Sequence, residues 1–154
     1  MCLELHSAGC FRHLAHEADN NPEQKEMPEA NATFTGSIPE NYDRYLGPIL
    51  FGPYADDLVS RLDISKDAAV LELACGTGIV TRRLIDRLGP GAKLLATDLN
   101  DSMLDYARAR FGSGDSVEWK QAEATDLPFA DRSFDAAVCQ FGLMFFPDKI
   151  NVFP

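Results

Sequence analysis

The 154-residue chain has few of the features that mark secreted or membrane-spanning proteins. Its four cysteines, Cys2, Cys10, Cys75 and Cys139, are too widely spaced to indicate a disulfide framework, so we expect a reducing, cytoplasmic location. No apolar run reaches the roughly 18 residues needed to cross a bilayer. The N-terminus also has no basic head followed by an apolar stretch, so we expect neither secretion nor a membrane span.

Basic residues are scarce as well. Lys and Arg number 14 against 24 Asp and Glu, which gives a net charge of −10. Binding to nucleic acid or to anionic lipid requires a basic surface, so this balance argues against both. The 45% of hydrophobic and 25% of charged residues are typical of a globular domain, and the expected partners are small molecules.

Large apolar side chains are sparse in the first 33 residues. Residues 1–33 carry six acids and two bases. A segment of this composition buries too little apolar surface to offset the conformational entropy that it would lose on becoming ordered. We therefore predict that residues 1–33 form an acidic, disordered tail. Met27 offers a second start for the reading frame, just before the segment in which helical spacing begins.

The predicted tail contains two cysteines and two histidines that could suggest zinc: Cys2, His6, Cys10 and His13. Structural zinc sites usually place two cysteines close together and a histidine pair elsewhere, and this interleaved order differs. We predict no metal site. Because His16 also lies in the tail, the sequence identifies no catalytic base and the catalytic residues stay unknown.

Apolar and aromatic residues recur at helical spacing from Pro39 onward and predict two short helices within residues 34–66, punctuated by Pro48 and by Pro53 at a first helical position. Residues 67–154 then alternate between short apolar and amphipathic segments. The predicted strands are Ala68–Ala74, Lys93–Asp98, Ser116–Gln121 and Phe134–Gln140, and the predicted helices are Thr77–Leu88 and Ser102–Phe111. This order indicates an α/β fold, a Rossmann-like parallel sheet with right-handed crossovers.

A glycine turn follows the first of these strands in Val70–Gly78, VLELACGTG. Gly76 and Gly78 allow positive φ and a close approach of a ligand to the backbone. A dinucleotide fingerprint would place a third glycine at Thr81, which disfavours a nicotinamide or flavin enzyme. Glu72 would oppose a pyrophosphate but could bind an ammonium, so the turn predicts a ligand that is cationic in part.

Three acids, Glu72, Asp98 and Glu123, come at or after the ends of three predicted strands. Open α/β sheets bind ligands at this edge. Asp98 follows Gly78 by 20 residues (98 − 78), the separation at which an acid reaches ribose hydroxyls. Each acid alone is also typical of a helix cap or a solvated loop, but together they indicate a ligand site.

Four linked motifs carry a family resemblance: VLELACGTG, ATDLN followed by Met103, QAEATDLPF, and SFDAAVCQFGLMFFPDK. In this order and spacing they resemble the class I S-adenosylmethionine-dependent methyltransferases, in the small-molecule branch that includes quinone-biosynthesis enzymes. The resemblance covers about residues 36–153 and implies S-adenosyl-L-methionine as cofactor and methyl transfer to a small-molecule acceptor. The family usually has glycine where this chain has Ala74.

The resemblance also implies a role for individual residues. The amino-acid part of the cofactor would lie against Glu72 and the backbone of Ala74, Cys75, Gly76 and Gly78. Asp98 would accept the ribose hydroxyls, while the adenine would lie between Leu99 and Met103, with Glu123 and the Ala124 N–H at its amino edge. Gln140 and Phe141 would border the sulfonium and the acceptor. Tyr42 and Tyr45 would lie on a helical lid, with ordinary core packing as a near-equal alternative.

The resemblance implies a further helix and further strands after Lys149, whereas the sequence stops at Pro154. In the family's strand order, 3-2-1-4-5-7-6, the strand Phe134–Gln140 would be left as an exposed edge that invites self-association. We therefore predict an incomplete domain that is inactive as a fragment. The alternative is a module that binds S-adenosylmethionine or S-adenosylhomocysteine without catalysis.

Overall fold

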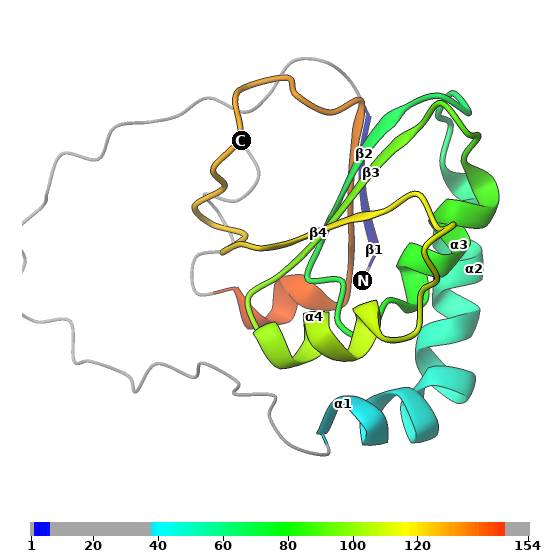
Figure 1. The fold of residues 1–154 in the computed structure, drawn as a ribbon, viewed down its shortest axis with the longest axis vertical. Helices are drawn as coiled ribbons and strands as arrows, with labels where there is room; N and C mark the ends of the chain where they lie inside the picture. The colour runs from blue at the N-terminus through cyan, green and yellow to red at the C-terminus, as the bar shows by residue number, and fades with distance from the viewer. Residues whose placement is uncertain (1, 7–37, 147–154) are drawn as a thin grey trace, which may run out of the picture.

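The computed structural model describes residues 2–6 and 38–146, which form one sheet with helices packed against it (Figure 1). The strand order is β1 (Cys2–His6), β5 (Ala136–Gln140), β2 (Ala69–Leu73), β3 (Lys93–Asp98) and β4 (Glu118–Gln121). β5, β2, β3 and β4 are parallel to one another, and β1 is antiparallel to β5. The predicted Rossmann-like α/β class and the order of its parallel strands are confirmed.

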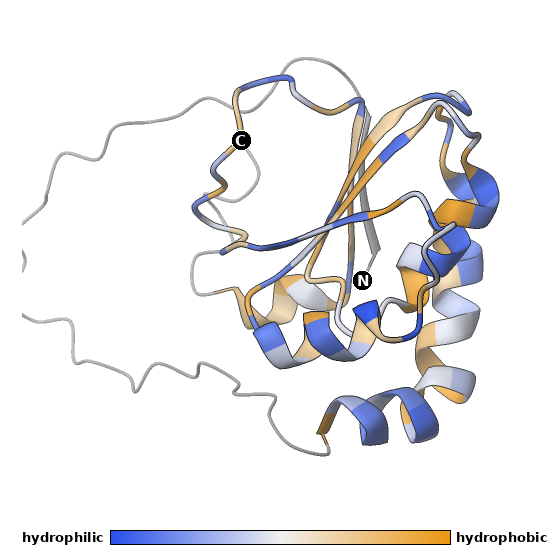
Figure 2. Ribbon diagram, in the orientation of Figure 1, coloured by the Kyte–Doolittle hydropathy of each residue, from blue (hydrophilic) through white to orange (hydrophobic). Residues whose placement is uncertain are grey.

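The central strands are buried on both faces, which is why they appear in the sequence as continuous apolar runs. Val70 and Val138 pack with Leu58 and Leu84 of the helices in one cluster. Their neighbours in β2 and β5 point to the opposite face, because side chains alternate along a strand. That second cluster includes Leu71, Leu73, Ala137 and Cys139, and Figure 2 shows the apolar colouring along the central strands.

Two helices connect the parallel strands. α3 (Ile79–Arg87) begins two residues later than predicted, because Thr77 and Gly78 belong to the turn before it. α4 (Asp101–Arg108) follows Asn100, whose side chain makes no capping hydrogen bond. In the described part of the chain, no helix has the length and apolarity required to span a membrane.

The N-terminal helices are continuous rather than separated by Pro48. α1 (Ile38–Asn41) leads into the π-helix η1 (Tyr42–Phe51) and then α2 (Gly52–Arg61), with Pro53 in its first turn as predicted. A proline inside an α-helix removes an N–H and clashes with the carbonyl four residues earlier. The wider π turn avoids this register, since the Gly52 N–H donates to the Gly47 carbonyl five residues before it.

The prediction of a free edge at Phe134–Gln140 is wrong. Cys2–His6, expected to belong to the disordered tail, form β1 and pair along β5, with Cys2 opposite Gln140 and His6 opposite Ala136. Edge N–H and C=O groups accept any strand with a compatible register, and the composition of the tail does not report on this. Residues 7–33 lie outside the described residues. Self-association stays a prediction, without the free edge as its support.

Candidate functional site

Backbone strain gathers at the carboxyl end of the sheet. Ala74, Gly76 and Gly78, in the turn between β2 and α3, have φ of 50°, 55° and 81°, and Phe141, directly after β5, has φ of 59°. Positive φ is uncommon for residues other than glycine and costs free energy, so it concentrates where function requires it. This end of the sheet is therefore the candidate site.

The two glycines of the turn have opposite surroundings. A Cβ on Gly78 would lie 2.8 Å from the Phe111 ring, so close packing excludes a side chain there. A Cβ on Gly76 would have no atom within 4 Å, so the backbone at Gly76 faces open space. A ligand can approach the chain closely at Gly76, as the sequence predicted.

Asp98 ends β3 beside this open space, and its side chain is fixed by two backbone donors. The Gly76 N–H donates to Oδ2 and the Asn100 N–H to Oδ1, each at 2.9 Å. Burial raises the pKa of Asp98, and these hydrogen bonds oppose the rise. Each carboxylate oxygen still has a lone pair for a further donor such as a ribose hydroxyl.

Glu72 lies on β2 behind the turn and is almost fully buried. Burial raises the pKa of Glu72 to about 8, against a hydrogen bond of 2.6 Å from Thr81 Oγ1 to Oε2. The acid is therefore largely protonated at pH 7 and is enclosed by protein. Sequence reasoning missed the role of Thr81, whose only signal was its place where a dinucleotide fingerprint has glycine.

Cys75 is enclosed in the same turn. Its N–H donates to the Thr97 carbonyl at 2.9 Å and its carbonyl accepts from the Gly78 N–H at 3.0 Å. Burial raises the pKa of the Cys75 thiol, which keeps it protonated and unreactive. The N–H groups of Cys75, Gly76 and Gly78 are thus all paired within the protein.

The predicted adenine contacts are placed unequally. Leu99 is 44% exposed directly after Asp98, whereas Met103 is 4% exposed in α4 and belongs to the core. Glu123 Oε1 accepts hydrogen bonds from the Thr125 N–H and Oγ1, so the loop after β4 holds its carboxylate in place. Ala124, in the same loop, packs against the second core cluster.

Aromatic rings from distant parts of the chain meet at the end of β5. The Phe141 ring lies 5.3 Å from Tyr54 and 5.7 Å from Phe51, and Tyr42 stacks on Phe51 at 5.6 Å. Sequence reasoning missed Phe51 and Tyr54 as members of this aromatic cluster.

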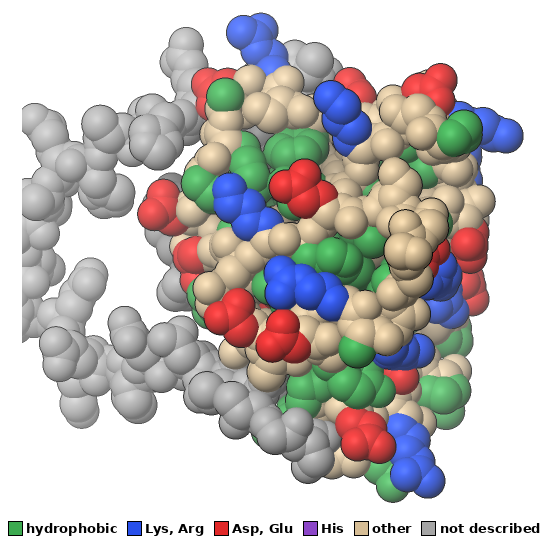
Figure 3. All heavy atoms as spheres, in the orientation of Figure 1, with side chains coloured by type: hydrophobic (Ala, Val, Ile, Leu, Met, Phe, Trp, Pro, Cys, Tyr) green, Lys and Arg blue, Asp and Glu red, His purple; other side chains and the backbone are tan. Residues whose placement is uncertain are grey.

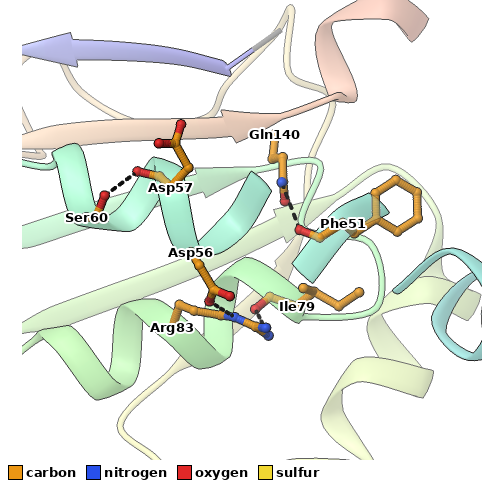
Figure 4. A network of polar contacts seen from close by, with 7 residues as sticks. All are labelled: Phe51, Asp56, Asp57, Ser60, Ile79, Arg83 and Gln140. Carbon is orange, nitrogen blue, oxygen red and sulfur yellow. Dashed lines mark hydrogen bonds and ion pairs between the residues drawn. The ribbon is translucent and has the colours of Figure 1, made fainter. Parts of the chain in front are cut away.

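Two further predicted residues lie near the aromatic cluster. Gln140 Nε2 donates to the Phe51 carbonyl at 3.0 Å (Figure 4). Tyr45 is 60% exposed and lies beside the Arg44 guanidinium. The structure thus brings Gln140, Phe141 and Tyr42 together and leaves Tyr45 at the surface.

Residues 70–153, more than half of the chain, match the family described as the methyltransferase domain. The chain belongs to this methyltransferase family. It is 31% identical over 118 residues to the demethylmenaquinone methyltransferase of Bacillus licheniformis, covering 75% of this chain and 51% of that relative. It is 38% identical over 94 residues to the ubiquinone/menaquinone biosynthesis C-methyltransferase UbiE of Hahella chejuensis, covering 59% and 38%.

The structural comparison shows a shared fold. A SAM-dependent methyltransferase from Aquifex aeolicus superposes with a TM-score of 0.65 at 20% identity, covering 75% of this chain and 62% of that one. The predicted class I methyltransferase family, with S-adenosyl-L-methionine as its cofactor, is confirmed. The chain spans about half or less of the length of these two curated relatives.

Proposed function

We propose that this chain forms the cofactor-binding part of an S-adenosylmethionine-dependent methyltransferase whose acceptor is a small molecule of the quinone type. The observation that carries the proposal is Asp98, held by two backbone donors next to the open space at Gly76. The family match and the names of the two curated relatives support the reaction and the acceptor class. The free, buried Cys75 fits a cytoplasmic location.

The described residues fit this cofactor. Asp98 would accept hydrogen bonds from its two ribose hydroxyls, and Leu99 would cover one face of the adenine. Glu123 and the Ala124 N–H would meet the amino edge of the base. A cation at the glycine turn would favour the charged form of Glu72, so binding would release a proton from this buried acid.

The bound cofactor would supply a methyl group that its sulfonium already activates. The chain would contribute position and the exclusion of water, which can supply much of the rate of such a displacement. The aromatic cluster offers flat apolar surfaces to a planar acceptor, and its ring faces attract a cation.

The test is isothermal titration of the purified chain with S-adenosylhomocysteine, a product that cannot turn over. Wild type should bind saturably and Asp98→Asn roughly 10- to 100-fold more weakly, because hydrogen bonds to the charged carboxylate are lost. Asp135→Asn is the matched control, since Asp135 also accepts a backbone N–H, from Ala69, at the opposite end of the sheet.

Further measurements separate the proposed methyltransferase from a nicotinamide enzyme and from a binding module. Binding of NAD instead of S-adenosylhomocysteine would contradict the proposal. A folded wild-type protein that binds no S-adenosylhomocysteine would contradict it as well. Incubation with S-adenosylmethionine and a demethylated quinone then tests turnover. Binding without any methylated product would favour a binding module over an enzyme.

A further inference from the structure

The π-helix η1 is joined to the site by a side-chain contact near each end. Near its start Asp43 contacts the glycine turn, and at its end the Phe51 carbonyl contacts β5. We infer that η1 is a strap along the site and that Asp43 and Gln140 are positioning residues that set how quickly bound cofactor leaves. This inference rests on the proposed function and adds two residues that act through the strap.

At the first contact, one carboxylate joins three elements. Asp43 of η1 forms an ion pair with Arg110, just after α4, and accepts a hydrogen bond from Thr77 Oγ1 at 3.4 Å. Burial and the charge of Asp43 also raise the pKa of Tyr106 in α4. The Asp43 side chain is 19% exposed and that of Arg110 46%, so water screens this ion pair only in part. Thr77 is the direct neighbour of Gly76, where the ligand would lie.

At the second contact, the Gln140 amide holds the last residue of η1. Gln140 Nε2 donates to the Phe51 carbonyl at 3.0 Å, as Figure 4 shows. Phe51 in turn packs against Phe141. The strap therefore borders the cofactor side of the site at one end and the acceptor side at the other.

Few residues of η1 are buried between these contacts. Gly47 is its only buried residue, and Ile49 and Tyr45 are 76% and 60% exposed. A π-helix is itself a rare conformation that occurs frequently at functional sites. A segment with few buried apolar contacts opens at low free energy, so the two end contacts should contribute strongly to keeping η1 in place.

A neighbouring contact provides a matched control. Arg83 of α3 donates from Nε to Asp56 Oδ1 at 2.8 Å and from Nη1 to the Ile79 carbonyl at 3.2 Å (Figure 4). This pair also fixes an N-terminal helix, α2, but it touches neither the glycine turn nor the end of β5. Asp56→Asn therefore removes an ion-paired carboxylate from α2, outside the strap, although Asp56 is 66% exposed against 19% for Asp43.

The experiment uses Asp43→Asn, which keeps the size of the side chain but loses its charge, and Gln140→Glu, which when ionised cannot donate to the Phe51 carbonyl. Stopped-flow displacement measures the dissociation rate of S-adenosylhomocysteine, and hydrogen exchange measures opening of residues 42–51 without ligand. Each variant should release ligand roughly tenfold faster and exchange faster in η1. Asp56→Asn should stay within about twofold of wild type, and Asp43→Glu should recover part of the loss.

Unchanged exchange in η1 would overturn the strap, provided that β2 and β3 remain protected and so show that the variants fold. Faster exchange in η1 with unchanged ligand dissociation would overturn its role in cofactor retention. If wild type binds no S-adenosylhomocysteine, the proposed function fails and the retention role with it. The exchange measurements would then still decide whether Asp43 and Gln140 hold the helix.

Discussion

The two ends of the sheet use acidic residues in opposite ways. At the carboxyl end, Glu72 and Asp98 are buried, and burial raises the pKa of each. At the amino end, Asp135 is exposed, and it both accepts from the Ala69 N–H and donates its own N–H to the Ala69 carbonyl, each at 2.8 Å. Exposed acids with satisfied partners stabilise a fold, whereas desolvated acids beside a strained turn mark a site.

The distribution of strained residues matches this contrast. Among the described residues, all positive φ values except that of Arg132 lie in the glycine turn or directly after β5. Each costs stability, so removing the strain or the buried charge should help the fold. The comparison therefore predicts that changes at the carboxyl end can affect binding as well as stability, and that changes at the amino end affect stability alone.

The largest effect should come from Glu72→Gln at alkaline pH. Because the folded protein holds the Glu72 proton up to about pH 8 and the unfolded chain only up to its ordinary pKa of 4.5, wild-type stability should fall as pH rises through this window. Glutamine can still accept from Thr81 and needs no proton. At pH 9 the variant should be more stable by on the order of 3–5 kcal/mol, measured by urea unfolding from pH 4 to 9. If the unfolding free energies of wild type and variant changed with pH in parallel, Glu72 would not be desolvated.

Gly142→Ala should have the next largest effect. A Cβ there would overlap the Ala74 Cβ and lie 3.0 Å from Cys139 Sγ. Overpacking of this kind should lower the unfolding free energy by about 2 kcal/mol. The double variant with Ala74→Gly removes the overlapping methyl group and the left-handed alanine, so urea midpoints should show recovery of at least half of the loss. If the effects of the two substitutions on the unfolding free energy simply add, the two residues are not in contact.

Asp135→Ala tests the amino end. The Ala69 N–H loses its acceptor but can reach water, so unfolding should become easier by only about 0.5–1 kcal/mol. Affinity for S-adenosylhomocysteine should stay within experimental error in the titration. A clear loss of affinity would break the division between the two ends.

Leu99→Ala should have the smallest effect on stability and a visible effect on binding. Leu99 is 44% exposed, so the unfolding free energy should change by less than about 0.5 kcal/mol. If its side chain covers the adenine, affinity for S-adenosylhomocysteine should fall roughly fivefold to tenfold, because apolar contact is lost. Unchanged affinity would place the adenine elsewhere.

Much of the sheet could be predicted because local sequence suffices for it. The strand Lys93–Asp98 was predicted with its observed bounds, and Glu72, Asp98 and Glu123 lie at the predicted edge. The strand Cys2–His6 was missed, because its pairing depends on the free backbone of β5 rather than on its own composition. Pro48 was expected to break a helix and instead lies within a π-helix, a geometry that residue spacing does not reveal.

The sequence by itself determined the alternation of strands and helices, the glycine turn, the acid after β3 and the motifs that carry the family resemblance, since each consists of residues close together in the chain. The order of the parallel strands in the sheet came only from that resemblance. Only the tertiary structure decided the surroundings of these residues. Gln140 reaches the Phe51 carbonyl across 89 positions and Thr77 reaches Asp43 across 34. The tertiary structure also decided the pKa of Glu72, which rises because the folded neighbours exclude water from the carboxyl group. Local sequence does not encode that burial.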